Sequence, residues 1–223
     1  MLITFEGLDC SGKSTQAKLL VEKLKVVIPG IKGMNPTVRF VREPGGTSIS
    51  ERIREILLDK DHHELTDAAE LFLFSASRSQ LVKEMIFPAL RRGETIVCDR
   101  FSDSTTAYQG YGRGLDLQTV QAINNLTTSG TKPDLTLLID IPVEEVERRR
   151  ALMGSPNDRM EEAGRQFYER VRNGYLKIAQ EERGRVVVID GSESIENVAR
   201  AVWTVVEPWL LSHKTRSTIV EEK

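Results

Sequence analysis

The chain has 223 residues, of which 39% are hydrophobic and 29% are charged, and this is enough apolar material for one buried core. A formal net charge of −2 excludes a global attraction to nucleic acid polymers or anionic membranes, so a phosphate site requires a local group of Arg and Lys. Two cysteines, Cys10 and Cys98, are too few for a disulfide framework and fit a reducing, cytoplasmic location.

Five short apolar runs recur along the chain, each followed by a polar or glycine-bearing turn and a helical pattern. They cover residues 2–5, 38–41, 95–98, 135–139 and 186–189. Because these runs do not alternate with polar residues, they suit parallel strands covered by helices on both faces. The sequence predicts one three-layer α/β/α domain over residues 1–212, with a flexible tail at 213–223. Ligands are expected at the carboxyl ends of the strands.

The first run leads directly into a glycine-rich loop and then a helical pattern. Gly7, Gly12, Lys13 and Ser14 fit the P-loop spacing, in which backbone N–H groups and a helix N-terminus face phosphate oxygens. Lys13 is expected to reach the β- and γ-phosphates of a nucleoside triphosphate, and Ser14 to bind Mg²⁺. A chance glycine-rich turn is the alternative, which the strand–loop–helix context disfavours. The candidate phosphate-binding residues are Gly7, Leu8, Asp9, Cys10, Ser11, Gly12, Lys13, Ser14 and Thr15.

A long helix is predicted over residues 67–92, because Gly93 then ends the helical pattern. Phe74 and Arg78 lie four residues apart on it and share a face, so a base could lie across them. An aromatic residue on such a helix is more often part of the core, and the pairing with Arg78 is what favours a binding role. Arg42 follows the second run. It could bind a phosphate group or belong only to a Pro-Gly-Gly turn, and neither interpretation is favoured.

The third run ends in Asp99, which is placed to act on the metal in the manner of a Walker-B carboxylate. Arg100 follows at once, and its guanidinium could clamp a phosphate group with a charge-assisted fork. A surface ion pair is the alternative for Arg100.

Residues 131–134 (TKPD) superficially resemble a guanine-reading segment of GTPase switch proteins. They precede a predicted strand, at the edge of the sheet opposite the ligands, so a Pro-Asp turn is favoured. A motor or helicase is disfavoured by the short chain and the lack of an extended basic surface. A small-molecule kinase remains.

Three further segments indicate which family of kinases the chain resembles. They are residues 42–47 (REPGGT), 99–101 (DRF) and 104–110 (STTAYQG). With residues 7–15 they resemble the thymidylate kinase family, in the same order, from residue 2 to about residue 210. The resemblance implies a P-loop nucleoside monophosphate kinase fold with a helical lid. It implies phosphoryl transfer from ATP to thymidine monophosphate with Mg²⁺ for dTTP synthesis, usually in a homodimer.

By the same resemblance, Phe74 stacks on the thymine ring, Arg78 binds its carbonyl edge and Tyr108 lies against the deoxyribose. Asp9 receives an active-site role on the sugar or metal side without fixed chemistry. The residues from Ser104 to Thr106 could instead cap a helix. The candidate acceptor-binding residues are Arg42, Phe74, Arg78, Arg100, Ser104, Thr105, Tyr108 and Gln109. The candidate metal ligands are Ser14, Asp99 and Asp9.

A lid is predicted over about residues 148–162. Some family members carry an Arg in the P-loop at the position of Cys10, and others place basic residues in the lid; Cys10 predicts the second kind. Met153 stands where the family pattern expects an Arg. Arg159 and Arg149 are therefore predicted to supply catalytic positive charge, and Arg159 is preferred. Together with Lys13, Asp9 and Arg100 they are the candidate catalytic residues. A helix of mixed acids and bases could also be a solvated face.

Two alternatives stay open. The first is a nucleoside or nucleotide kinase with a different base preference. The second is a regulatory P-loop ATPase without an acceptor.

Overall fold

The computed structural model describes the backbone of residues 1–153, 159 and 164–220, and the side chains of these residues except 153 and 212–220. In this part of the chain, five parallel strands form one sheet in the order β2-β3-β1-β4-β5. Each apolar run predicted from the sequence forms one strand, so that prediction is confirmed. The strands are β1 (Leu2–Glu6), β2 (Val38–Arg42), β3 (Thr95–Asp99), β4 (Leu135–Asp140) and β5 (Val186–Asp190).

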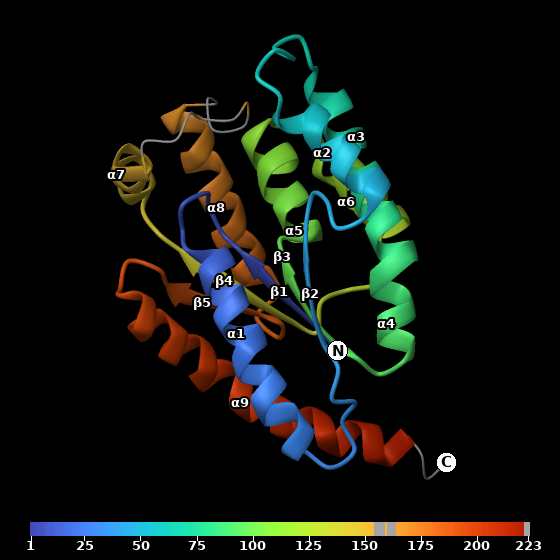
Figure 1. Ribbon diagram of the computed structural model, residues 1–223. Coiled ribbons are helices and arrows are strands. Elements are labelled where there is room, and N and C mark those ends of the chain that lie inside the picture. Colours follow the sequence, from blue (N-terminus) through green and yellow to red (C-terminus); the bar gives the residue numbers. More distant parts are fainter. Residues whose placement is uncertain (154–158, 160–163, 221–223) are drawn as a thin grey trace.

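Helices cover both faces of the sheet, which explains why the strands can be apolar throughout (Figure 1). On one face, α1 (Lys13–Val27) packs over β1, β2 and β3 and α9 (Ile195–Val220) packs over β5, with Phe5 and Leu137 in the shared core. The opposite face holds α8 with Leu138 and Tyr175, and the α3–α4 helical region with Val41. The remaining helical elements are η1 (Ile28–Gly30), α2 (Ser48–Leu58), α3 (Asp67–Leu81), η2 (Val82–Ile86), α4 (Phe87–Arg91), α5 (Ser102–Thr105), η3 (Thr106–Gly112), α6 (Leu117–Thr127), α7 (Val143–Met153) and α8 (Arg165–Glu181).

The long helix predicted over residues 67–92 is present but interrupted. Helix α3 passes into the π-helical turn η2 and then into α4, which ends before Gly93. Pro88 lies just after this turn; it lacks an N–H, and its ring would collide with a carbonyl group of the preceding helical turn. The wider π-helical turn is one way in which a helix adjusts near such a residue.

The C-terminal helix α9 continues to Val220, further than the sequence predicts, because residues 213–220 were expected to lie in a flexible tail. Flexibility itself stays a prediction, and residues 221–223 lie outside the described residues. Of the predicted lid, residues 154–158 and 160–162 also lie outside them. No helix in the described part of the chain is long and apolar enough to cross a membrane.

The carboxyl ends of the strands meet at one edge of the sheet. Phe5 of β1 and Arg42 of β2 are both in register with Asp99 of β3. The P-loop, the segment after β2 and the residues after β3 therefore begin side by side. This edge is where a parallel sheet of this kind binds ligands, and its side chains define the candidate site.

Candidate active site

The P-loop has the backbone geometry that its glycines allow. Gly7 has φ 140°, and a Cβ there would lie 2.3 Å from the carbonyl oxygen of Ile139, so no larger residue fits. Gly12, with φ 88°, lies directly before α1. The loop therefore ends at the N-terminus of a helix, where unpaired N–H groups and partial positive charge favour an anion.

Lys13 lies over this loop, with its Nζ donating to the carbonyl oxygen of Leu8 at 3.2 Å and 3.7 Å from Asp9 Oδ1. Burial and the nearby charge of Arg100 lower the pKa of Lys13, while Asp9 opposes the shift. The ammonium group is thus held in a partly desolvated position beside the loop, where it would interact strongly with phosphate.

A cavity of about 620 Å³ opens next to the P-loop. Arg149 of α7 crosses it, because its Nη1 donates to the carbonyl of Cys10 at 3.2 Å and its Nη2 to the carbonyl of Gly191 at 2.7 Å. The volume of this cavity falls within the range of small-molecule binding sites. Besides the P-loop residues Asp9 to Thr15, it is lined by Gln16, Arg149, Leu152, Gly191, Glu193, Ile195 and Val198.

Two of the predicted metal ligands fit a cation site. Asp99 is buried, and its Oδ1 makes no hydrogen bond within the described part of the chain. Ser14, in the first turn of α1, is exposed. No group of three or more His, Cys, Asp or Glu side chains in the described residues could hold a metal alone. Proteins commonly bind Mg²⁺ through one or two ligands together with substrate phosphates, and Ser14 and Asp99 have the oxygen atoms that this requires.

A second cavity of about 100 Å³ lies on the other side of Asp9. It collects most of the acceptor residues predicted from the sequence, which come from two separate segments, α3 and the stretch that follows β3. Of those candidates, Phe74, Arg78, Arg100, Ser104, Thr105, Tyr108 and Gln109 line it. The remaining lining residues are Asp9, Glu43, Pro44, Arg54 and Leu58.

Arg100 is held at this cavity by an unusual backbone and by several side chains. Its φ of 70° is rare for a residue with a Cβ. Its Nη2 donates to Asp9 Oδ1 at 2.5 Å and to the hydroxyl of Tyr108 at 3.1 Å. Its Nη1 donates to the carbonyl of Gly7 at 3.0 Å. The guanidinium is therefore fixed between the P-loop and the second cavity.

Asp9 lines both cavities. Burial raises the pKa of its carboxyl group, but the charges of Arg100 and Lys13 and the hydrogen bond from Tyr108 outweigh burial, so the pKa lies well below its ordinary value. Asp9 is therefore ionised near neutral pH. Because Arg100 and Tyr108 already engage both of its oxygens, its role as a metal ligand stays a prediction.

Arg78 and Phe74 of α3 form one wall of the second cavity. Arg78 is buried, and it donates from Nε to Glu43 at 2.7 Å, from Nη1 to Asn124 at 3.0 Å and from Nη2 to the carbonyl of Phe101 at 3.0 Å. Phe74 is half-buried, so part of its ring is available to a ligand. The two residues share this wall as their spacing predicts.

The structure does not bring Arg42 into the second cavity. Its guanidinium donates to the carbonyl of Pro44 and to Glu51, both at 2.8 Å, and it belongs to the turn after β2. Arg54 of α2, which the sequence reasoning missed, lines the cavity instead and donates to the same carbonyl at 3.0 Å. Arg54 lies four residues after the buried Ser50 and three before the buried Leu57, so helical spacing could have revealed its inward position.

The two lid arginines lie in different places. Arg159 donates to Glu70 at 2.7 Å and to the carbonyl of Leu57 at 2.9 Å, so it contacts the α2–α3 side of the molecule. Glu70 also holds Gln109 and Arg113. Of the two predicted lid cations, the described structure brings Arg149 to the P-loop cavity and does not bring Arg159 there.

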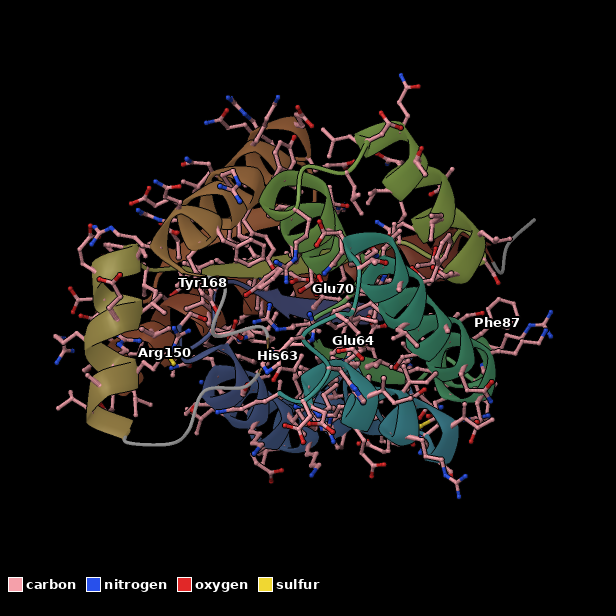
Figure 2. All side chains as sticks on the ribbon, turned by 90° about the horizontal axis from the view of Figure 1, so that it is seen from above. His63, Glu64, Glu70, Phe87, Arg150 and Tyr168 are labelled. Atoms are coloured by element: carbon pink, nitrogen blue, oxygen red, sulfur yellow. The ribbon has the colours of Figure 1, made fainter. Side chains whose placement is uncertain are left out.

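Sequence reasoning also missed Tyr168 of α8. Its hydroxyl lies 3.3 Å from Asp9 Oδ2 and accepts a hydrogen bond from Arg150 of α7 at 3.1 Å. Figure 2 looks onto the molecule from above, with Tyr168 and Arg150 on one side and Glu70 nearer the centre. Tyr168 is 159 positions from Asp9 along the chain, and no local pattern links the two.

A parallel sheet with a P-loop after its first strand and a second cavity beside that loop defines the fold of P-loop nucleoside monophosphate kinases. The model of the thymidylate kinase family matches residues 5–202. The chain therefore belongs to the thymidylate kinase family, and the expectation from the sequence is confirmed at that level.

Individual relatives agree over most of the chain. It is 48% identical over 203 residues to the thymidylate kinase of Pelodictyon phaeoclathratiforme, covering 87% of this chain and 90% of the relative. It is 46% identical over 211 residues to that of Geotalea daltonii, covering 92% and 95%. The crystal structure of thymidylate kinase from Ehrlichia chaffeensis matches with a TM-score of 0.73 at 36% identity, covering 93% of this chain and 98% of that one.

Proposed function

We propose that the chain transfers the γ-phosphoryl group of ATP to thymidine monophosphate, giving ADP and thymidine diphosphate for dTTP synthesis. The observation that carries this proposal is the pair of cavities that meet at Asp9, one lined by the P-loop and the other by Phe74, Arg78 and Arg100. Transfer between two phosphates requires two such sites in contact, because positioning and charge neutralisation supply most of the catalysis.

In the second cavity, which would be the acceptor cavity, Arg100 and Arg54 would bind the monophosphate, since both guanidinium groups face the same space. Phe74 would stack on the base, and Arg78 would donate to a base carbonyl with the N–H groups that its protein partners leave over. The cavity volume of about 100 Å³ is small beside the roughly 300 Å³ of a typical ligand site, so side chains must move when the acceptor binds.

In the cavity next to the P-loop, which would be the donor cavity, the P-loop N–H groups and Lys13 would bind the β- and γ-phosphates of ATP. Mg²⁺ would be held by the Ser14 hydroxyl and the free Oδ1 of Asp99, and when bound it would neutralise charge on the transferred group. Lys13 and Arg100 would lie on the two sides of the reacting phosphates. The acceptor phosphate is already ionised near neutral pH, so no protein base is required.

Arg149 is the better candidate for the extra cation that a P-loop with Cys10 lacks. It lines the donor cavity and already contacts the carbonyl of Cys10. A guanidinium here would stabilise charge that develops on the transferred phosphoryl group. Arg159 could act only if it left Glu70.

We further propose that the protein is a cytoplasmic homodimer, as the family resemblance implies. Sedimentation of the purified protein tests the homodimer, and a monomer at micromolar concentration would rule it out under those conditions.

The test of the reaction is a coupled ADP-release assay with ATP and Mg²⁺ across thymidine, deoxyuridine, uridine, cytidine, adenosine and guanosine monophosphates. The fastest turnover is expected with thymidine monophosphate. The missing methyl group of deoxyuridine monophosphate is expected to reduce kcat/KM by roughly 10- to 200-fold. A preference for another base would leave a kinase with a different acceptor, and ADP release independent of any acceptor would indicate an ATPase.

A further inference from the structure

Behind Arg100 lies a buried polar cluster that the mechanism above does not use. Glu6, the last residue of β1, has no exposed surface. Its Oε1 accepts the backbone N–H of Phe101 at 2.7 Å. Its Oε2 accepts the hydroxyl groups of Ser104 at 2.5 Å and Tyr175 at 2.9 Å. Burying a carboxyl group costs free energy that hydrogen bonds must offset, and the three donors here come from two segments, residues 101–104 and α8.

The partners of Glu6 are also partners of Arg100. Nη1 of Arg100 donates to Ser104 Oγ and to the Tyr175 hydroxyl, each at 3.2 Å. Glu6 also binds the N–H of Phe101, the residue that follows Arg100 and its left-handed backbone. The carboxyl group therefore holds two side chains that contact Arg100 and the backbone N–H of the residue after Arg100. In the described part of the chain, no hydrogen bond joins Glu6 to the guanidinium itself.

We propose that Glu6 is a positioning residue for Arg100, which aims the guanidinium into the acceptor cavity by fixing Ser104 and Tyr175 behind it. This inference rests on the proposed role of Arg100 in binding the acceptor phosphate. It predicts that Glu6 affects the acceptor site and not the donor site, although it lies directly before the P-loop in the sequence.

The number of protons in the cluster shows which substitution should preserve it. Ser104 Oγ and the Tyr175 hydroxyl lie 2.8 Å apart, so these two oxygens and Glu6 Oε2 form a triangle with three short edges. If Glu6 is ionised, the two hydroxyl protons can fill only two edges. If Glu6 is protonated, each edge has a proton. Burial, together with the charge of Asp103, raises the pKa of Glu6 to about 7, which is consistent with a shared proton.

Glu6→Gln keeps the oxygen that accepts the Phe101 N–H and supplies an N–H₂ group to the triangle, so it mimics the protonated acid. Glu6→Leu keeps similar bulk and removes every polar contact. Tyr175→Phe removes one apex of the triangle and one acceptor of Arg100. Glu94 is a matched control, because it is a buried acid at the opposite edge of the sheet, where it pairs with Arg39 and Arg92.

The experiment measures KM for thymidine monophosphate and for ATP in these variants, in the parent and in an Arg100→Ala background. Glu6→Leu is expected to raise the acceptor KM about tenfold or more, as the loss of one hydrogen bond to a charged group would, and to change the ATP KM less than about threefold. Glu6→Gln should stay within about threefold of the parent, and Glu94→Gln should leave the acceptor KM unchanged. With Arg100→Ala present, Glu6→Leu should add less than about threefold, because its effect acts through Arg100.

Equal losses by Glu6→Leu in both backgrounds, or equal rises in both KM values, would overturn the proposal. If Glu6→Leu does not fold, Tyr175→Phe decides by the same two criteria. If the parent does not phosphorylate thymidine monophosphate, the proposed function fails separately. Urea unfolding of the parent, Glu6→Leu, Arg100→Ala and the double variant then tests the coupling alone. Non-additive midpoint shifts support a Glu6–Arg100 linkage, and additive shifts refute it.

Discussion

Glu43 offers a test of whether the acceptor cavity carries a buried acid that titrates near neutral pH. The side chain pairs with Arg78, with Oε2 accepting from Arg78 Nε at 2.7 Å and Oε1 buried without a hydrogen bond in the described structure. Burial raises the pKa of Glu43 from 4.5 to about 7, although the charge of Arg78 acts in the opposite direction. Glu43→Gln replaces the titrating group with a neutral one of the same shape.

The folded protein binds the proton of Glu43 more tightly than the unfolded chain does, so protonation of Glu43 stabilises the folded state. The stabilisation from protonated Glu43 is full below pH 4.5 and is lost as pH rises through about 7. One pKa unit corresponds to about 1.4 kcal/mol, so the whole effect is about 3 kcal/mol, and most of it falls between pH 5 and pH 8. The free energy of unfolding of Glu43→Gln, relative to the parent, should therefore increase by about 2 to 3 kcal/mol over this range.

Urea unfolding at pH 5, 6, 7 and 8 measures this difference. The midpoint of Glu43→Gln should move relative to the parent by roughly 1 M over the range, since m-values for small proteins are about 1–3 kcal/mol/M. Glu84→Gln, an exposed change on the same side of the molecule, serves as the control and should give a constant difference. Parallel curves for parent and Glu43→Gln would show that Glu43 does not titrate in this range, and the reasoning from burial would be wrong.

Five further substitutions, in three experiments, test the site assignments. Arg149→Ala should lower kcat at saturating substrates by about tenfold or more, while Arg159→Ala should leave it within about threefold; the reverse order would restore Arg159 as the catalytic cation. Arg54→Ala should raise the acceptor KM by about tenfold, and Arg42→Ala should change it less than about threefold, as steady-state kinetics with varied acceptor would reveal. Gly7→Ala should cost about 2 kcal/mol or more, because its Cβ would lie 2.3 Å from a carbonyl oxygen at the end of β4; an unchanged Tm would refute the clash.

The sheet and the P-loop are predictable because their signals are local. Continuous apolar runs become parallel strands, and the glycines of the loop meet a φ requirement that is written in adjacent residues. Phe74 and Arg78 were found for the same reason, since four residues on a helix fix a shared face. Each of these features is specified by residues within one short stretch of the sequence.

The missed residues depend on contacts between distant elements. Tyr168 and Tyr175 reach Asp9 and Glu6 from α8, more than 150 positions away, and nothing in the sequence of α8 indicates which of its aromatic residues point to this edge. Arg42 was selected because it opens a conspicuous motif, and Arg54 was not considered. The direction of each guanidinium depends on residues elsewhere in the chain, Glu51 for Arg42 and the carbonyl of Pro44 for Arg54.

Pairing with acids also explains how the site gathers cations in a chain of net charge −2. Arg78 pairs with Glu43, and Arg100 pairs with Asp9. These pairs differ in consequence. Glu43 pairs with Arg78 and carries a raised pKa, so it can become neutral and leave Arg78 as an unneutralised cation at the second cavity. The pKa of Asp9 is lowered, so it stays charged at the junction of the two cavities. A phosphate that binds Arg100 must therefore approach this carboxylate, and the repulsion can be offset only by positive charge at the same place. Lys13, 3.7 Å from Asp9, supplies part of that charge from the donor side. Lys13 therefore lowers the cost of placing a phosphate on Arg100 beside the charged Asp9.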